Sequence, residues 1–189
     1  SGSIRNDERG VLIRVEGSDR DLESFQAALS RNPPRAARVE SIARTTIDVA
    51  ARLGFKVETA EEAIEVAARI PVDLAVCAAC LEEVNDPFDR RFGYPFTNCT
   101  DCGPRLTIID AMPYDRPRTS MSNFGMCTEC RREYGNPDDR RFHAQPIACA
   151  ACGPEAIAID PSGTILERGR AAIRYVADAL RDGELAVLK

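Results

Sequence analysis

The sequence has no tryptophan, a single histidine and no apolar run near the roughly 18 residues that a membrane-spanning helix needs. No charged-then-apolar leader of the secretory kind is present. Basic residues are in deficit, because 25 Lys and Arg face 30 Asp and Glu, which gives a formal net charge of −5. Nucleic-acid binders normally carry an excess of basic charge. We therefore expect a globular cytoplasmic protein that binds neither membranes nor nucleic acid.

All eight cysteines lie in C-x2-C pairs. The pairs are Cys77 and Cys80, Cys99 and Cys102, Cys127 and Cys130, and Cys149 and Cys152. A disulfide framework would rarely place every cysteine in such a pair, and cytosolic thiols stay reduced. Two C-x2-C turns close a tetrahedral structural zinc site, whereas the closely spaced runs typical of ferredoxin clusters are missing. The sequence therefore predicts two structural Zn2+ ions, each bound by four thiolates.

An internal repeat suggests which cysteines share a metal. A shift of 50 residues places 77–104 on 127–154, and 12 of the 28 aligned positions are identical. Such self-similarity indicates a duplicated unit that closes its own site, so we expect Cys77, Cys80, Cys99 and Cys102 to bind one ion and the other four cysteines the second. A nested pairing of outer with outer and inner with inner pairs is the alternative. His143 aligns with Gly93, so we expect a structural or surface histidine and no ligand.

Other repeated residues are typical of a structural scaffold. The motif Asp-Arg-Arg-Phe occurs at 89–92 and 139–142, and it predicts a turn with a local salt bridge around a buried aromatic. Binding of a partner by these arginines is the alternative. Gly103 and Gly153 follow the second cysteine pair of each copy, where positive φ would turn backbone N–H groups toward the thiolates. A simple turn is the other interpretation.

The N-terminal flank predicts a small α+β unit. Val11, Ile13 and Val15 alternate as in a half-buried strand. A helix is expected from an N-cap at Asp19 to the prolines at 33–34, with an apolar stripe formed by Leu22, Phe25 and Leu29. Short strands are expected at 39–43 and 55–57. A capping box at 59–62 predicts a connecting helix over 63–70.

The C-terminal flank predicts one helix followed by one strand. Ile173, Val176, Ala177 and Leu180 lie on one helical face, and Gly183 occupies the position of a C′ glycine. The apolar run 185–188 then predicts a strand, which needs neighbours on both sides. We expect this flank to open a further domain.

The motifs that connect the cysteine pairs resemble those of the HypF family, carbamoyltransferases that mature [NiFe] hydrogenases. They are Asn98-Cys99-Thr100-Asp101-Cys102-Gly103-Pro104-Arg105, Pro113-Tyr114-Asp115-Arg116-Pro117, Thr119-Ser120-Met121 and Arg141-Phe142-His143-Ala144-Gln145. The resemblance implies an α+β internal fragment: the later part of a ferredoxin-like acylphosphatase domain (1–58), a connector (59–70), a tandem zinc-finger module (71–160) and the start of a YrdC-like α/β domain (161–189).

The resemblance also implies the chemistry of the parent enzyme. Carbamoyl phosphate would be hydrolysed at the acylphosphatase site, and ATP with Mg2+ would give carbamoyl-adenylate at the YrdC-like site. The carbamoyl group would then pass to the C-terminal cysteine of HypE, a partner in cyanide ligand synthesis. Asn6 matches the asparagine that orients the attacking water, while Lys189 matches a YrdC-like lysine whose role one terminal residue cannot support. The family's phosphate loop precedes Asn6, so we expect the 189-residue chain alone to be inactive. A zinc-dependent protein-interaction or chaperone-like module without catalysis is the alternative function.

Overall fold

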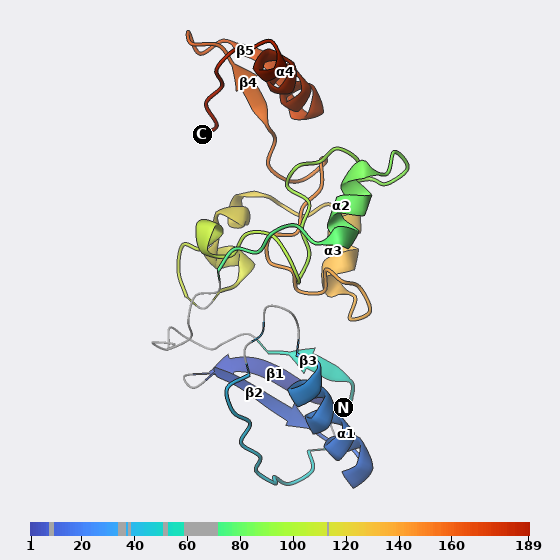
Figure 1. Ribbon diagram of the computed structural model, residues 1–189. Coiled ribbons are helices and arrows are strands. Elements are labelled where there is room, and N and C mark those ends of the chain that lie inside the picture. The colour runs from blue at the N-terminus through green and yellow to red at the C-terminus, as the bar shows by residue number, and fades with distance from the viewer. Residues whose placement is uncertain (8–9, 34–36, 38, 51–52, 59–71, 113) are drawn as a thin grey trace.

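The N-terminal part of the chain is a three-stranded sheet with one helix. The computed structural model describes residues 1–189 except 8–9, 34–36, 38, 51–52, 59–71 and 113. Strands β1 (Gly2–Asp7) and β2 (Gly10–Val15) form an antiparallel hairpin, and β3 (Phe55–Val57) lies parallel to β1, which gives the order β2-β1-β3. Helix α1 (Asp19–Arg31) lies over one face of this sheet (Figure 1). The mixed α+β class predicted from the sequence is confirmed.

Helix α1 begins and ends close to the predicted positions. Its N-cap is Ser18, one residue before the expected Asp19, because the Asp21 N–H donates to Ser18 Oγ at 3.3 Å. Asp19 instead occupies the first turn, where the helix dipole favours a carboxylate. The apolar stripe is half-buried. The expected strand at 39–43 is wrong, because β3 takes the place beside β1 and the described residues offer this segment no partner strand.

The central part is built from the two cysteine repeats. In each repeat the first cysteine caps a short helix, Cys77 for α2 (Ala78–Asn85) and Cys127 for α3 (Thr128–Gly135). Three 3-10 helices lie between them in the described residues, η1 (Leu106–Ile108), η2 (Arg116–Arg118) and η3 (Ser120–Asn123). The buried apolar side chains are few, and most of them are cysteines. The connecting helix expected over 63–70 lies outside the described residues.

The C-terminal part is a hairpin followed by a helix. Strands β4 (Ile157–Ile159) and β5 (Ile165–Arg168) pair antiparallel and precede α4 (Gly169–Arg181), whose predicted apolar face is present. Gly183 has a φ of 86°, as expected for a C′ glycine. The strand expected at 185–188 is wrong, since its three large apolar side chains are at least 94% exposed and no described strand pairs with it. The hairpin was not predicted, and the boundary expected between residues 160 and 161 lies within it.

Candidate metal centre

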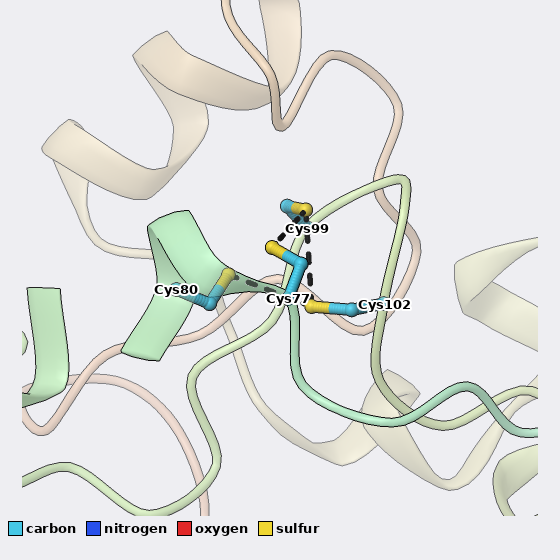
Figure 2. Close-up of side chains that lie close together, drawn as sticks. All are labelled: Cys77, Cys80, Cys99 and Cys102. Carbon is cyan, nitrogen blue, oxygen red and sulfur yellow. Dashed lines mark hydrogen bonds between the residues drawn. The ribbon is translucent and has the colours of Figure 1, made fainter. Parts of the chain in front are cut away.

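Each repeat gathers its own four sulfur atoms into one cluster. Cys77, Cys80, Cys99 and Cys102 form the first cluster, which Figure 2 shows, and Cys127, Cys130, Cys149 and Cys152 form the second. Within each cluster all four Sγ atoms lie within 4.8 Å of one another. The grouping is the sequential one that the repeat suggests, and the nested alternative is not the arrangement found. We call these sets the first and second cysteine clusters.

The spacing of the sulfur atoms fits a tetrahedral ion. In the first cluster, Cys77–Cys99, Cys99–Cys102 and Cys80–Cys102 are separated by 3.8, 3.8 and 3.5 Å between Sγ atoms. The corresponding distances in the second cluster are 3.8, 3.7 and 3.6 Å. A tetrahedron with Zn–S near 2.3 Å has edges of about 3.8 Å, whereas a disulfide would bring two sulfurs to about 2.0 Å. Both clusters are therefore consistent with a structural zinc ion, and with four thiolates they leave no open position for a substrate.

Local backbone geometry holds the sulfur atoms at these positions. The first cysteine of each repeat caps a helix, so the second cysteine sits one turn later on the same face and is fully buried, as seen for Cys80 and Cys130. Backbone N–H groups also donate to sulfur, from Asp101 to Cys99 Sγ at 3.4 Å and from Cys130 to Cys127 Sγ at 3.5 Å. These contacts favour thiolates over thiols.

Four thiols packed this closely cannot all ionise without a cation. The pKa of Cys99 is lowered to about 5, chiefly because the Cys80 thiol donates to its sulfur, and the same contact raises the pKa of Cys80. Burial raises the pKa of Cys102, and it raises that of Cys130 to about 12. A bound divalent ion would remove this competition, because it stabilises all four thiolates together.

Two arginines of the second repeat contact the first cluster. The Arg140 guanidinium donates from Nη2 to Cys80 Sγ at 3.2 Å and from Nη1 to Cys77 Sγ at 3.7 Å. Arg141 Nη2 lies 3.9 Å from Cys80 Sγ. Both arginines also pair with Glu83 on α2, Arg140 Nη2 at 2.7 Å from Oε2. The first cluster is therefore capped by cations that come from the other repeat.

The reciprocal contact is present at the second cluster. Arg90 Nη2 and Arg91 Nη2 lie 3.4 and 3.7 Å from Cys130 Sγ. Both arginines pair with Glu133 on α3, at 2.7 Å for Arg90 and 2.5 Å for Arg91. Burial raises the pKa of Glu133, but the hydrogen bonds from Arg91 and Arg90 outweigh it and lower the pKa to about 2. The glutamate is therefore a permanent anion that fixes the arginine pair.

This arrangement corrects the expectation of a local salt bridge around a buried aromatic. The ion pairs join the two repeats, Phe92 is only half-buried, and the buried side chains are Arg91 and Arg141, which are 2% and 3% exposed. Their Nε atoms donate to the carbonyl oxygens of Ala148 at 3.0 Å and Asn98 at 2.9 Å. Each buried guanidinium thus has partners for its donors, as a buried charge requires.

Comparison with known proteins places the chain in one family. Residues 76–109 and 126–159 match the family model described as HypF finger, and residues 1–57 match the acylphosphatase model. The chain is 41% identical to a structure of full-length HypF in a phosphate- and nucleotide-bound form, with a TM-score of 0.84 over 96% of this chain and 23% of that one. HypF of T. kodakarensis gives 38% identity and a TM-score of 0.82 over the same shares. The chain belongs to the HypF family.

Curated HypF relatives agree with this assignment. The carbamoyltransferase HypF of Rhizobium leguminosarum bv. viciae is 45% identical over 123 residues, which is 65% of this chain and 16% of the relative. The probable carbamoyltransferase HypF of Methanocaldococcus jannaschii is 38% identical over 119 residues, 61% of this chain and 15% of the relative. The chain thus spans about one sixth of the length of these HypF proteins. No helix among the described residues is long and apolar enough to cross a membrane.

The glycines after the second cysteine pairs serve close packing in this HypF segment. Gly103 has a φ of 93°, but its N–H donates to a backbone carbonyl and does not face sulfur. Gly153 lacks a positive φ, and a Cβ there would lie 2.2 Å from the Tyr94 hydroxyl and 2.5 Å from Ala148 Cβ. The expectation that both glycines turn N–H groups toward thiolates is therefore wrong. Neighbouring side chains instead leave no room for a Cβ, including that of Asn98 at Gly103.

His143 lies outside both cysteine clusters. It has a φ of 51°, which matches the positive φ of Gly93 at the same place in the first repeat. Its ring packs on Tyr134 and Phe142, with centroid distances of 4.8 and 4.5 Å. Burial lowers the pKa of His143, so the ring is neutral at physiological pH. These contacts give the histidine a structural position in the second repeat.

Sequence reasoning missed two buried arginines that satisfy the loop carbonyls. Arg105 donates to the carbonyl oxygens of Cys99, Thr100, Cys102 and Pro104. Arg116 donates to those of Phe124, Gln145 and Ile147. Isolated arginines in a loop carry no spacing signal, so their burial at 6% and 8% exposure could not be read from the sequence.

The two residues matched to catalytic parts of the family lie far along the chain from the clusters. Asn6 is in β1 opposite Val11, and its side chain is outside the described part of the structure. Lys189 is exposed at the last position. A role for Asn6 in orienting water therefore stays a prediction from the family resemblance.

Proposed function

We propose that this chain is the finger-bearing segment of a carbamoyltransferase that uses carbamoyl phosphate and ATP to carbamoylate the C-terminal cysteine of a HypE-type partner. The product would serve cyanide ligand synthesis in [NiFe]-hydrogenase maturation. The observation that carries the proposal is the match to HypF structures over 96% of the chain at 41% identity. HypF finger matches over both repeats support it.

Two structural Zn2+ ions would be held by the two cysteine clusters, and they would supply no reaction step, because four thiolates saturate a tetrahedral ion. The eight cysteines would instead fix the loops that carry the buried arginines. In the parent enzyme the fingers would hold the acylphosphatase-like part and a following YrdC-like domain in register. Contact of the fingers with the C-terminal part supports this, since Arg170 of α4 stacks on the Phe92 ring at 4.0 Å from its centroid.

The chain alone is proposed to be inactive. The family resemblance places the arginine-bearing phosphate loop before Asn6, and a carbamoyl phosphate without a cation and a ring of N–H donors loses most of its stabilisation. ATP with Mg2+ would bind to the YrdC-like domain of the parent enzyme. Neither substrate is therefore assigned to a described residue of the finger module.

A chimera tests the proposal. This segment would replace the corresponding residues of a full-length HypF relative, and transfer of a labelled carbamoyl group to the C-terminal peptide of HypE would be followed by mass spectrometry. We expect transfer by the chimera and its loss in the double variant Cys80→Ser, Cys130→Ser, with substrate hydrolysis partly retained. A zinc-loaded chimera that never carbamoylates HypE would refute the transferase role. Normal transfer by the double variant would refute the role of the fingers in alignment.

A further inference from the structure

The arginine pairs lie at the interface between the repeats and not within either repeat. Together with Glu83 and Glu133 they line a cavity of about 510 Å3 between the loops that follow α2 and α3. Among the described residues, every contact of a guanidinium with sulfur crosses from one repeat to the other. The sulfur ligands of each cluster come from one repeat, whereas the cations that cap them come from the other.

We propose that the two cysteine clusters are a coupled pair, in which Arg90 with Arg91 and Arg140 with Arg141 are positioning residues for the metal of the opposite repeat. Occupation of one cluster then strengthens metal binding at the other. The inference rests on the proposed binding of zinc by both clusters, and it assigns the repeated arginines a role that the transfer reaction does not require.

Charge explains why the arginines favour the metal-loaded cluster. Four thiolates and one divalent ion carry a formal charge of −2, and the two sets of cysteines are mostly buried, so salt screens this charge weakly. N–H groups that donate to an ionised acceptor make stronger hydrogen bonds than neutral pairs do. Two arginines and one glutamate add a net +1 beside each cluster. The caps therefore stabilise thiolates that would otherwise face each other in a poorly solvated site.

The path of the chain explains why the two sites are coupled. Cys127 and Cys130 lie in the first turn of α3, and the loop that carries Arg140 directly follows that helix. The Arg140 carbonyl accepts hydrogen bonds from Thr100 N at 3.2 Å and Thr100 Oγ1 at 3.0 Å, and Thr100 lies between the last two ligands of the first cluster. A metal in the second repeat thus orders the loop that caps the first cluster. The reciprocal contacts of Arg90 and Arg91 give the reverse effect, as thermodynamic linkage requires.

Crossed substitutions test this proposal. Arg90→Gln and Arg140→Gln are suitable because these side chains are 30% and 29% exposed, so their loss opens no buried void. The zinc-loaded 189-residue chain would be treated with a limiting amount of chelator and pulsed with an alkylating agent, and peptide mapping would show which cysteines lose their metal first. We expect Arg140→Gln to release the first cluster first and Arg90→Gln to release the second. The affinity of the affected site should fall about 10- to 100-fold.

Two further variants complete the experiment. Arg132 lies on α3 beside the same cavity and is exposed, with no contact to sulfur among the described residues, so Arg132→Gln should leave the order and rates of release unchanged. If Arg140→Gln cannot be loaded with metal, Arg140→Lys keeps the charge without the planar fork and should give a smaller shift in the same direction. Release that begins in the substituted repeat, in both clusters equally, or in the wild-type order would overturn the coupling. A wild-type chain that binds no zinc would instead refute the proposed zinc role itself.

Discussion

Removal of the metal should unfold the finger module, because little else holds it together. Apart from cysteines, the buried large apolar side chains among the described residues from 77 to 152 are Tyr94, Met121 and Ile147. Full burial of such a side chain contributes about 1.5–3 kcal/mol. A structural zinc site with cysteine ligands contributes about 10–16 kcal/mol at pH 7 in small fingers. Two sites therefore exceed the apolar contribution several-fold, and chelation removes the larger share.

Chelation also leaves charges without partners in the module. Arg91 and Arg141 are almost fully buried, and they face sulfur atoms and glutamates whose geometry depends on the metal. An uncompensated buried charge costs several kcal/mol, so a collapsed metal-free module of the same shape is disfavoured. We expect the metal-free segment to unfold and not to persist as a loosened native structure.

The assay is circular dichroism and limited proteolysis of the purified chain at neutral pH, with zinc measured in the same sample. Before chelation we expect two zinc ions per chain and eight unreactive thiols. After chelation we expect loss of helical signal and new cleavage between residues 77 and 152, both reversed by added zinc. An unchanged spectrum and an unchanged cleavage pattern in a sample shown to be metal-free would refute the reasoning, since the remaining contacts would then suffice.

Particular contacts lead to three more expected outcomes. Arg91→Met should destabilise the chain by about 3 kcal/mol or more in denaturant unfolding, because it leaves Glu133 without its closest partner, whereas Arg168→Met removes an exposed pair and should cost less than about 1 kcal/mol; equal losses would contradict this. Gly93→Ala should cost about 1–2 kcal/mol for its positive φ, and displacement of the Arg170 side chain from its aromatic ring should add about 0.5–1 kcal/mol, which Gly163→Ala, with a free Cβ position, would not show. Native mass spectrometry during zinc release should show little one-metal species, because a coupling of about 1–3 kcal/mol favours the fully loaded and empty forms; a dominant one-metal species would indicate independent sites.

The metal ligands were predictable because their signal is local. A C-x2-C pair requires only that two side chains converge from one turn, so spacing along the chain carries the information. The capping of α1, the position of β2 and the end of α4 at Gly183 follow from equally local rules, and those predictions agree with the structure. The strands expected at 39–43 and 185–188 failed because a strand depends on partners that hydropathy does not reveal.

The crossed arginine contacts could not be read from the sequence for a different reason. The Asp-Arg-Arg-Phe motif is close to the glutamate of its own repeat, and a local salt bridge is the natural interpretation. Arg91 instead pairs with Glu133, 42 residues away, and Arg141 with Glu83, 58 residues away. Only the fact that the arginines and the glutamate recur together in both copies indicates that they form one set. That recurrence is equally compatible with pairing within or between repeats, so the structure was needed to decide.

The residues that differ between the repeats support the same interpretation of those that are identical. The identical positions include all four ligands, the two arginines and the glutamate with which they pair, and these groups make equivalent contacts in both copies. Gly93 and His143 share a positive φ but not their surroundings, since Gly93 is covered by Arg170 and His143 packs on Tyr134. Divergence is thus found where the two copies meet different neighbours, and identity where each copy completes the other. A single copy would have four ligands but no capping cations, so the reciprocal caps give a physical reason for two fingers to occur as a pair.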